Sequence, residues 1–405
     1  MSQSRDRNRR REDKPGANMR RRRLPAVLGI IVLSLLSVSG CQGNEPLSTP
    51  PLIREEASAT SLVNSTARPE ASPSGALAAT EPAGTAVLQR ATPVVTSGTG
   101  PLYDLVFSIP VGQDNIQYRG LDVPDMETTG PNNLVVLPDG AFVLADLIGN
   151  RLLWYSPVGE LLREVDLSAL DILNVSYLRA AGEGLILLEV SFRVAPERYR
   201  VHRLSAAGEL LASYDLPEGL LLGDGLSGIG AGCGGEILVE LQGGAQVYQL
   251  VESEGTYSFR YSPEGYPWDG RFYNMLLGPL AVLGEATVET AFTFGFGGLS
   301  LLQANPDGSS YVIREDVVSD PVIIVDRTVH FMDARGRQLG VAREPIDERL
   351  YYVSGELAVG PDGAVYHLIP RRDRLDVVRL NFYEALEPLL PGARLPVIVT
   401  LREAP

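Results

Sequence analysis

Residues 131–162 read PNNLVVLPDGAFVLADLIGNRLLWYSPVGELL. Apolar runs of five or six residues alternate there with short segments rich in Pro, Asp, Asn and Gly, at 138–140, 147–150 and 156–160. Such runs are typical of β-strands, and the glycines permit the positive φ that tight turns require. The stretch therefore predicts four antiparallel strands joined by three hairpins, the content of one β-propeller blade.

Weaker copies of this pattern follow along the chain. Gly140, Gly184 and Gly235 mark the same turn in successive copies, 44 and 51 residues apart, and a late copy covers residues 357–368. About 305 residues at about 50 residues each give an all-β propeller of six blades. The register is lost between Gly265 and Gly308, where residues 306–308 fit two different turns, so five to seven blades stay open.

The last copy lacks a strand. Its third strand ends near residues 375–380, and no fourth apolar run with the same pattern follows. The segment 103–109, YDLVFSI, has the composition of the missing strand but lies before the first copy. We expect this N-terminal strand to complete the last blade and close the ring, because closure removes sheet edges that would invite aggregation.

Residues 130–163 resemble the NHL repeat, which carries apolar runs separated by Asp-Gly and by Asp…Asn-Arg. The resemblance implies that Asp146, Asn150 and Arg151 cap loops as structural residues. More loosely, the body is similar to the six-bladed propeller superfamily that includes the NHL proteins and the gluconolactonase-type hydrolases.

The gluconolactonase-type relationship implies an alternative function as a metal-dependent lactone or ester hydrolase. That family holds a divalent metal with a glutamate in a Glu-Gly-Pro context plus Asn and Asp ligands. Here the matching tripeptide is Thr129-Gly130-Pro131, and Asn132 and Asn133 are the remaining weak candidates for metal ligands. Amide oxygens alone bind such a cation weakly. The chain also lacks a Gly-x-Ser-x-Gly motif. We therefore expect no catalytic residue, no metal and no cofactor.

Other polar features have structural explanations. His202, His330 and His367 show no ligand spacing and lie in strand-like runs, so we expect packed side chains rather than metal ligands. The acidic stretch 314–320 is predicted to be a solvated blade edge. The glycine-rich stretch 293–298 is predicted to be a bulge or a crossing between blades.

The N-terminus has the pattern of a secretory signal. Residues 1–23 are basic, residues 24–38 are mostly apolar, and Val38-Ser39-Gly40-Cys41 is similar to the lipobox of bacterial lipoproteins. This similarity predicts a signal peptide over 1–40 and a lipid-modified Cys41 that anchors the chain at the extracytoplasmic face of the bacterial cell membrane. An ordinary signal peptide or a membrane anchor with a coincidental cysteine remains the alternative.

Residues 41–100 are rich in Ser, Thr, Pro and Ala and show no apolar periodicity. This composition predicts a disordered tether that precedes the propeller domain at 101–405. Without residues 1–40, 25 basic and 47 acidic residues remain, a net charge of −22. Such a surface would repel phosphates, so we expect no nucleic-acid partner. The expected partners are the lipid bilayer, through Cys41, and an extracellular protein, peptide or glycan that the propeller binds as a scaffold.

Overall fold

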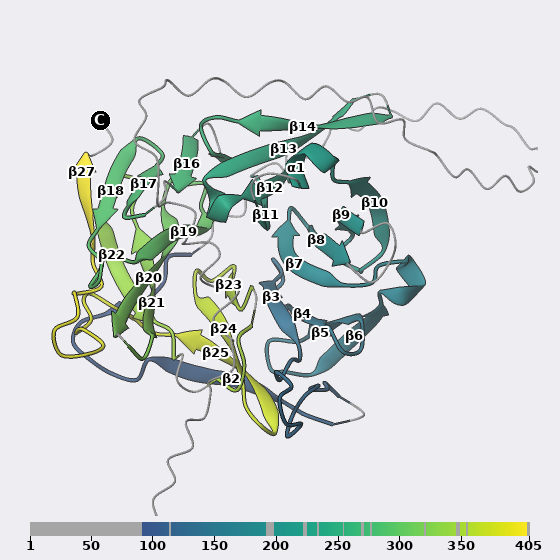
Figure 1. Ribbon diagram of the computed structural model, residues 1–405, viewed down its shortest axis with the longest axis horizontal. Helices are drawn as coiled ribbons and strands as arrows, with labels where there is room; N and C mark the ends of the chain where they lie inside the picture. The colour runs from purple at the N-terminus through teal and green to yellow at the C-terminus, as the bar shows by residue number, and fades with distance from the viewer. Residues whose placement is uncertain are drawn as a thin grey trace, which may run out of the picture. The chain divides into compact units, whose positions relative to one another are not determined.

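The computed structural model describes residues 91–112, 115–191, 198–221, 225–232, 235–253, 255–268, 271–275, 278–319, 321–345, 349–353 and 355–402. In this part of the chain, six mainly antiparallel sheets surround a central axis as the blades of a β-propeller (Figure 1). Within these ranges the helices are one short α-helix, α1 (Glu218–Leu221), and the 3₁₀ turns η1 (Ser168–Leu170) and η2 (Gln242–Gly244).

Blades 1 to 3 each contain four strands that are consecutive in the sequence. Blade 1 contains β3 (Asn132–Val136), β4 (Phe142–Asp146), β5 (Arg151–Tyr155) and β6 (Leu161–Asp166). Blade 2 contains β7 (Val175–Ala181), β8 (Gly184–Ser191), β9 (Arg198–Leu204) and β10 (Leu210–Asp215). Blade 3 contains β11 (Leu226–Ala231), β12 (Ile237–Leu241), β13 (Gln246–Ser253) and β14 (Thr256–Ser262).

Blades 4 to 6 each add strands from distant parts of the chain. Blade 4 contains β15 (Tyr266–Trp268), β16 (Arg271–Met275), β17 (Leu280–Leu283), β18 (Ala286–Thr290) and β27 (Ile398–Arg402). Blade 5 contains β19 (Gly297–Ala304), β20 (Ser310–Ser319), β21 (Ile324–Met332), β22 (Gln338–Arg343), β26 (Phe382–Tyr383) and β1 (Val95–Thr96). Blade 6 contains β23 (Leu357–Val359), β24 (Val365–Pro370), β25 (Arg374–Leu380) and β2 (Tyr103–Pro110).

The six-bladed prediction is confirmed, and the ambiguous turn is now placed. Residues 306–308 connect β19 to β20, which makes them the turn between the first two strands of blade 5. Gly140 lies in the corresponding turn of blade 1, with a φ of 86° that side chains other than glycine rarely adopt. The stretch 293–298 contains the crossing from blade 4 to blade 5, between β18 and β19.

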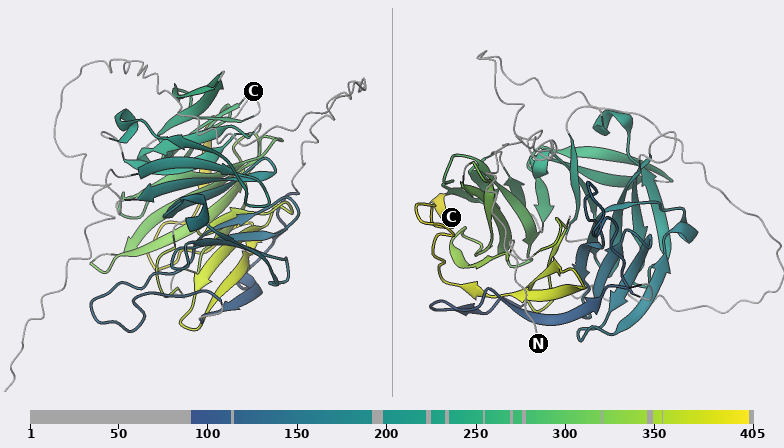
Figure 2. Two further views of the ribbon diagram at one scale, coloured as in Figure 1. Left: turned by 90° about the vertical axis from the view of Figure 1, so that its right-hand side faces the viewer. Right: turned by 60° about the horizontal axis from the view of Figure 1, so that its bottom comes forward.

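Strand β2 is the outermost strand of blade 6. It pairs antiparallel with β25, with Tyr103 opposite Leu380 and Pro110 opposite Arg374. In Figures 1 and 2 this blue N-terminal strand lies beside the yellow C-terminal strands. The last blade therefore takes its fourth strand from the N-terminal side of the chain.

Two further additions cover the outer edges of blades 4 and 5. β27 pairs antiparallel with β18, while β26 and β1 form a short parallel pair beside β22. The sequence pattern places residues 91–100 in the tether, whereas in the structure they lie on the body. Val95 pairs with Phe382, and the Ala91 amide donates to the Pro361 carbonyl at 3.2 Å. Two-residue strands leave no periodic pattern, which explains the late boundary predicted at residue 100.

The apolar core lies between neighbouring sheets. Strands β3 and β4 are buried on both faces, whereas the outermost strand β6 is largely exposed. Between blades 6 and 1, Phe107 of β2 packs edge-on against Phe142 of β4, with ring centroids 5.3 Å apart. Burying one such side chain contributes about 1.5–3 kcal/mol, so the inter-blade contacts hold the ring together.

Candidate functional site

One end of the body gathers loops that connect successive blades, together with the turn between β20 and β21 of blade 5. We call this end the loop face and define it by the described residues of loops 111–131, 291–296, 320–323 and 344–356. The strand register places these loops together in blade 5. Gly297, which begins β19, lies opposite Asp316 near the end of β20, and Ser319 lies opposite Ile324. Arg343 at the end of β22 then lies opposite Thr328 in the middle of β21.

Apolar side chains from three of these loops face solvent. Phe294, Phe296, Val322, Ile323 and Tyr352 are each 50–69% exposed. Large apolar side chains exposed close together on loops are a common feature of interaction surfaces. The sequence signal for part of this surface is residues 293–298, TFGFGG, where two phenylalanines alternate with glycines.

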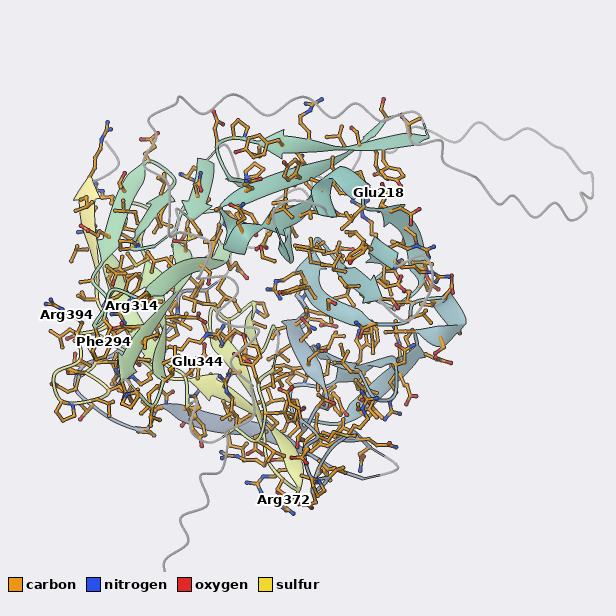
Figure 3. All side chains as sticks on the ribbon, viewed as in Figure 1. Glu218, Phe294, Arg314, Glu344, Arg372 and Arg394 are labelled. Carbon is orange, nitrogen blue, oxygen red and sulfur yellow. The ribbon has the colours of Figure 1, made fainter. Side chains whose placement is uncertain are left out.

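Beneath the loop face lies a buried group of ionisable residues, which we call the Glu–His cluster: Glu344, Glu356 and His367. Glu344 follows β22 of blade 5, Glu356 precedes β23 of blade 6, and His367 lies on β24. Each residue offers a ligand atom within 4.8 Å of the other two, and each is at most 2% exposed. Figure 3 labels Glu344 near the strands of blade 6.

Two arginines neutralise part of this cluster. Arg327 of β21 contacts Glu356, and its guanidinium lies 3.1 Å from the Glu344 carboxylate and 2.8 Å from that of Glu315. Arg349 lies 3.3 Å from Glu356 and stacks over the exposed ring of Tyr352 at 4.9 Å. The loop face and the cluster are therefore joined through Arg349 and Tyr352.

Burial shifts both kinds of ionisable group toward their neutral forms. Desolvation raises the pKa of Glu344 to about 6, although Arg327 and Arg349 oppose the shift. Burial, together with the positive charge of the same arginines, holds the pKa of His367 well below its usual value. The imidazole is therefore neutral at pH 7, the form in which histidine binds metals.

Asn132 and Asn133, the weak candidates for metal ligands, bind blade 1 to the first strand of blade 2. Asn132 Nδ2 donates to the Val175 carbonyl at 3.4 Å, and Asn133 Nδ2 donates to the Ser176 carbonyl at 3.2 Å. Asn133 Oδ1 accepts the Leu178 amide at 3.2 Å. Blade 1 is thereby bound to β7 of blade 2, and of these atoms only Asn132 Oδ1 has no described hydrogen-bond partner.

The residues of the blade 1 motif cap their loop. Asp146 accepts the Gly149 amide at 3.2 Å and pairs with Arg151 at 2.8 Å. Asn150 Nδ2 donates to the Ile172 carbonyl at 2.9 Å, which connects blade 1 to the segment before blade 2. These bonds stabilise the loop between β4 and β5.

The acidic stretch in blade 5 is not the solvated edge that the sequence indicated. Arg314 and Asp316 are fully buried and paired at 2.8 Å, whereas Glu315 between them is half-exposed. β20 is the second strand of its sheet, so neighbouring blades cover both of its faces. Asp316 also accepts the amide and hydroxyl of Thr293, each at 2.8 Å, and so fixes the loop that carries Phe294.

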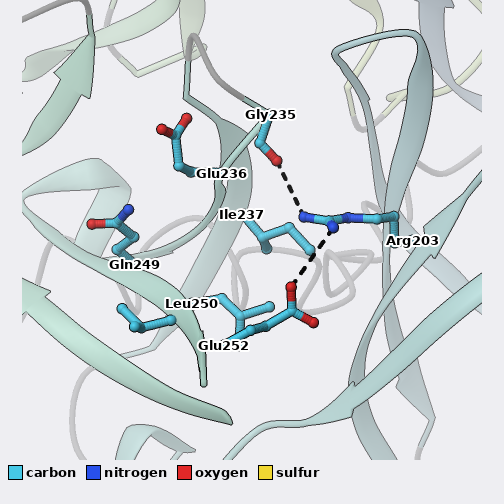
Figure 4. A pocket seen from close by; sticks show the side chains of 8 residues that line it. Arg203, Gly235, Glu236, Ile237, Gln249, Leu250 and Glu252 are labelled. Carbon is cyan, nitrogen blue, oxygen red and sulfur yellow. Dashed lines mark hydrogen bonds and ion pairs between the residues drawn. The ribbon is translucent and has the colours of Figure 1, made fainter. Parts of the chain in front are cut away.

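A shallow hollow of about 320 Å³ lies between blades 2 and 3 (Figure 4). Arg203 crosses it, donating to the Gly235 carbonyl at 3.3 Å and lying 3.8 Å from the Glu252 carboxylate. The hollow is open, and Arg203 already pairs with Glu252 across it. It lacks the enclosed apolar walls typical of small-molecule sites.

No protein-family model and no functionally curated protein matches the chain. Several solved structures are similar to it, and these are six-bladed propellers. A streptogramin B lyase has a TM-score of 0.35 at 14% identity, over 69% of this chain and all of that one. A member of the DUF4221 family from Bacteroides vulgatus gives 0.41 at 10%, over 69% and 98%. A glucose dehydrogenase gives 0.39 at 12%, over 69% and 99%.

These likenesses concern the fold and carry no activity to this chain. Among the described residues, no helix is long and apolar enough to cross a membrane. Cys41, the predicted lipid anchor, lies outside the described residues.

Proposed function

We propose that this chain is an extracytoplasmic binding module, anchored to the membrane by lipid on Cys41, whose loop face recognises a protein, peptide or glycan. The observation that carries the proposal is the set of exposed apolar side chains on three loops of that face. A rigid ring of sheets presents loops in fixed positions, which suits recognition of large ligands.

The anchoring part of the proposal rests on the sequence. Val38-Ser39-Gly40-Cys41 follows the apolar run directly, and the segment after Cys41 has the composition of a tether. The NHL-like pattern of blade 1 agrees with a scaffolding propeller. The strongly acidic body favours a ligand other than nucleic acid.

Site-specific photo-crosslinking tests the recognition face. A photoreactive residue replaces Val322 on the loop face or, as a matched control, Leu161, which is exposed at the opposite end of blade 1. In cells of the source organism, we expect position 322 to give a discrete adduct that position 161 does not give. The double substitution F294S/F296S should abolish it. Equal crosslinking from both positions would contradict the proposal.

The hydrolase alternative would require metal-dependent turnover, which the binding-module proposal does not. Its metal ligands would include Asn132 and Asn133, and the Asn133 oxygen already accepts the Leu178 amide of β7. The Glu–His cluster is too deeply buried to receive a substrate. Purified protein should show no hydrolysis of lactones or aryl esters with calcium, magnesium, manganese or zinc. Turnover that a chelator removes and metal restores would replace the binding-module proposal.

A further inference from the structure

The three histidines of this chain differ in whether their ring nitrogens have hydrogen-bond partners, which bears on ligand binding. All three are at most 1% exposed. His202 has both ring nitrogens bonded, to Ser213 at 2.8 Å and Glu189 at 3.0 Å. His330 likewise contacts Gln338 at 2.8 Å and Thr328 at 2.9 Å. For His367, neither Nδ1 nor Nε2 has a hydrogen-bond partner among the described residues.

The carboxylates beside His367 are also incompletely paired. Glu344 Oε1 and Glu356 Oε2 are buried without a described hydrogen-bond partner, while the other oxygen of each is held by arginine. His367 Nε2 lies 3.6 Å from Glu344 Oε2, beyond hydrogen-bonding distance. Leaving a buried polar group unpaired costs about 1–3 kcal/mol, and more for a charged group. Unpaired atoms on three neighbouring residues therefore point to a missing partner.

We propose that Glu344, Glu356 and His367 bind one divalent transition-metal ion that joins blade 5 to blade 6. Two carboxylate oxygens and one imidazole nitrogen suit zinc or manganese, whereas calcium and magnesium prefer oxygen ligands alone. Two of these ligands lie at the ends of the segment between β22 and β23 and the third lies on β24, so no regular spacing links them in the sequence and the histidine pattern gives no signal.

The surrounding residues hold these ligands in position. The Glu344 amide donates to the Arg327 carbonyl at 3.0 Å, and the Glu356 carbonyl accepts the Leu368 amide at 3.1 Å. Arg327 and Arg349 hold the second oxygens of the carboxylates, the supporting role that surrounding groups take in metal sites. Glu315, Glu344 and Glu356 outnumber these two arginines, so an excess of negative charge remains for a cation to offset.

The burial of the cluster assigns the ion a structural role. A catalytic metal keeps a coordination position open to substrate, whereas a structural metal is enclosed by protein. Glu344 belongs to blade 5, and Glu356 and His367 belong to blade 6. An ion bound to all three resists separation of these blades.

Metal titration of the full chain tests the proposal. After chelator treatment, we expect zinc or manganese to bind at one equivalent by calorimetry and to raise the melting temperature. Cobalt bound at this site should give visible absorption bands, and loss of the His367 imidazole as a ligand should change them. His367→Leu should weaken binding at least tenfold, and Glu344→Gln should do the same. His330→Gln is the matched control, since it alters a buried histidine whose nitrogens are already paired, and it should bind as the parent does.

A second measurement separates metal binding from a folding defect. In chelator, His367→Leu should melt at or above the parent temperature, because the replaced nitrogens have no described partner. With zinc or manganese present, it should melt below the parent. The proposal is wrong if the parent binds neither ion, or if His367→Leu binds them as tightly as the parent.

Discussion

Ser108 donates a 2.6 Å hydrogen bond to Asp376, a residue 268 positions later in the chain. The bond crosses the pairing of β2 with β25, and Arg371 and Arg374 contact the same carboxylate at 3.1 Å and 2.9 Å. Blade 6 therefore depends on residues from both ends of the propeller sequence. Substitutions in β2 should therefore change the stability of blade 6.

Phe107→Ala should lower the free energy of unfolding by about 3–5 kcal/mol, the usual cost of removing a buried phenylalanine. Phe107 is buried between blades 6 and 1, whereas Leu105 on the same strand is 59% exposed. Leu105→Ala should therefore change stability by about 0.5 kcal/mol or less. Urea denaturation measures both, and equal losses would show that β2 does not close the ring.

Asp316→Ala should destabilise the body by about 3–5 kcal/mol, because it leaves the fully buried Arg314 guanidinium without its carboxylate. The same change releases Thr293, so the loop with Phe294 should become more sensitive to protease. Asp122→Ala removes an exposed partner of Arg372 and should cost about 1 kcal/mol or less. Thermal melting and limited proteolysis check both variants. A proteolysis pattern identical to the parent's would argue against control of the loop by Asp316.

His330 should make the protein less stable in acid. Burial lowers the pKa of His330 from 6.5 to about 3, so the unfolded state takes up a proton that the folded state does not. Its contribution to stability should fall as the pH drops from about 6.5 toward 3, by at most about 1.4 kcal/mol per pH unit. The variant His330→Gln lacks this pH-dependent contribution to stability. The stability difference between parent and variant, measured in urea at pH 7, 6 and 5, should shift in favour of the variant as the pH falls, whereas a constant difference would refute the prediction.

Cys41→Ala should abolish incorporation of labelled fatty acid and leave the precursor unprocessed by the lipoprotein peptidase. The thiol is the acceptor of the lipid in the lipobox pattern, and alanine offers no replacement. Metabolic labelling followed by electrophoresis measures both effects. Cys233→Ala is the control and should label as the parent does. Labelling of the Cys41 variant would exclude the proposed anchor.

The sequence predicts the fold better than the site. The repeat of apolar runs and Asp-Gly turns in residues 131–162 contains enough local information to identify blades, because strand length and turn chemistry are local properties. The Glu–His cluster is not local, since Glu344, Glu356 and His367 come together only when blade 5 packs on blade 6. Arg314 and Asp316 show the same limit. Their polar sequence indicated a solvated edge, but their burial depends on neighbouring sheets.

The contact between Ala91 and Pro361 shows at which end of the propeller the chain enters. Residues 360–364 form the turn between β23 and β24, at the end of blade 6 opposite the loop face, because Leu357 pairs with His367 at one end and Val359 with Val365 at the other. The chain therefore enters the propeller from the side remote from Phe294 and Tyr352. If the chain is lipid-anchored as proposed, a tether that joins the body at this end need not run across Phe294 and Tyr352, so the apolar loops stay accessible to a ligand.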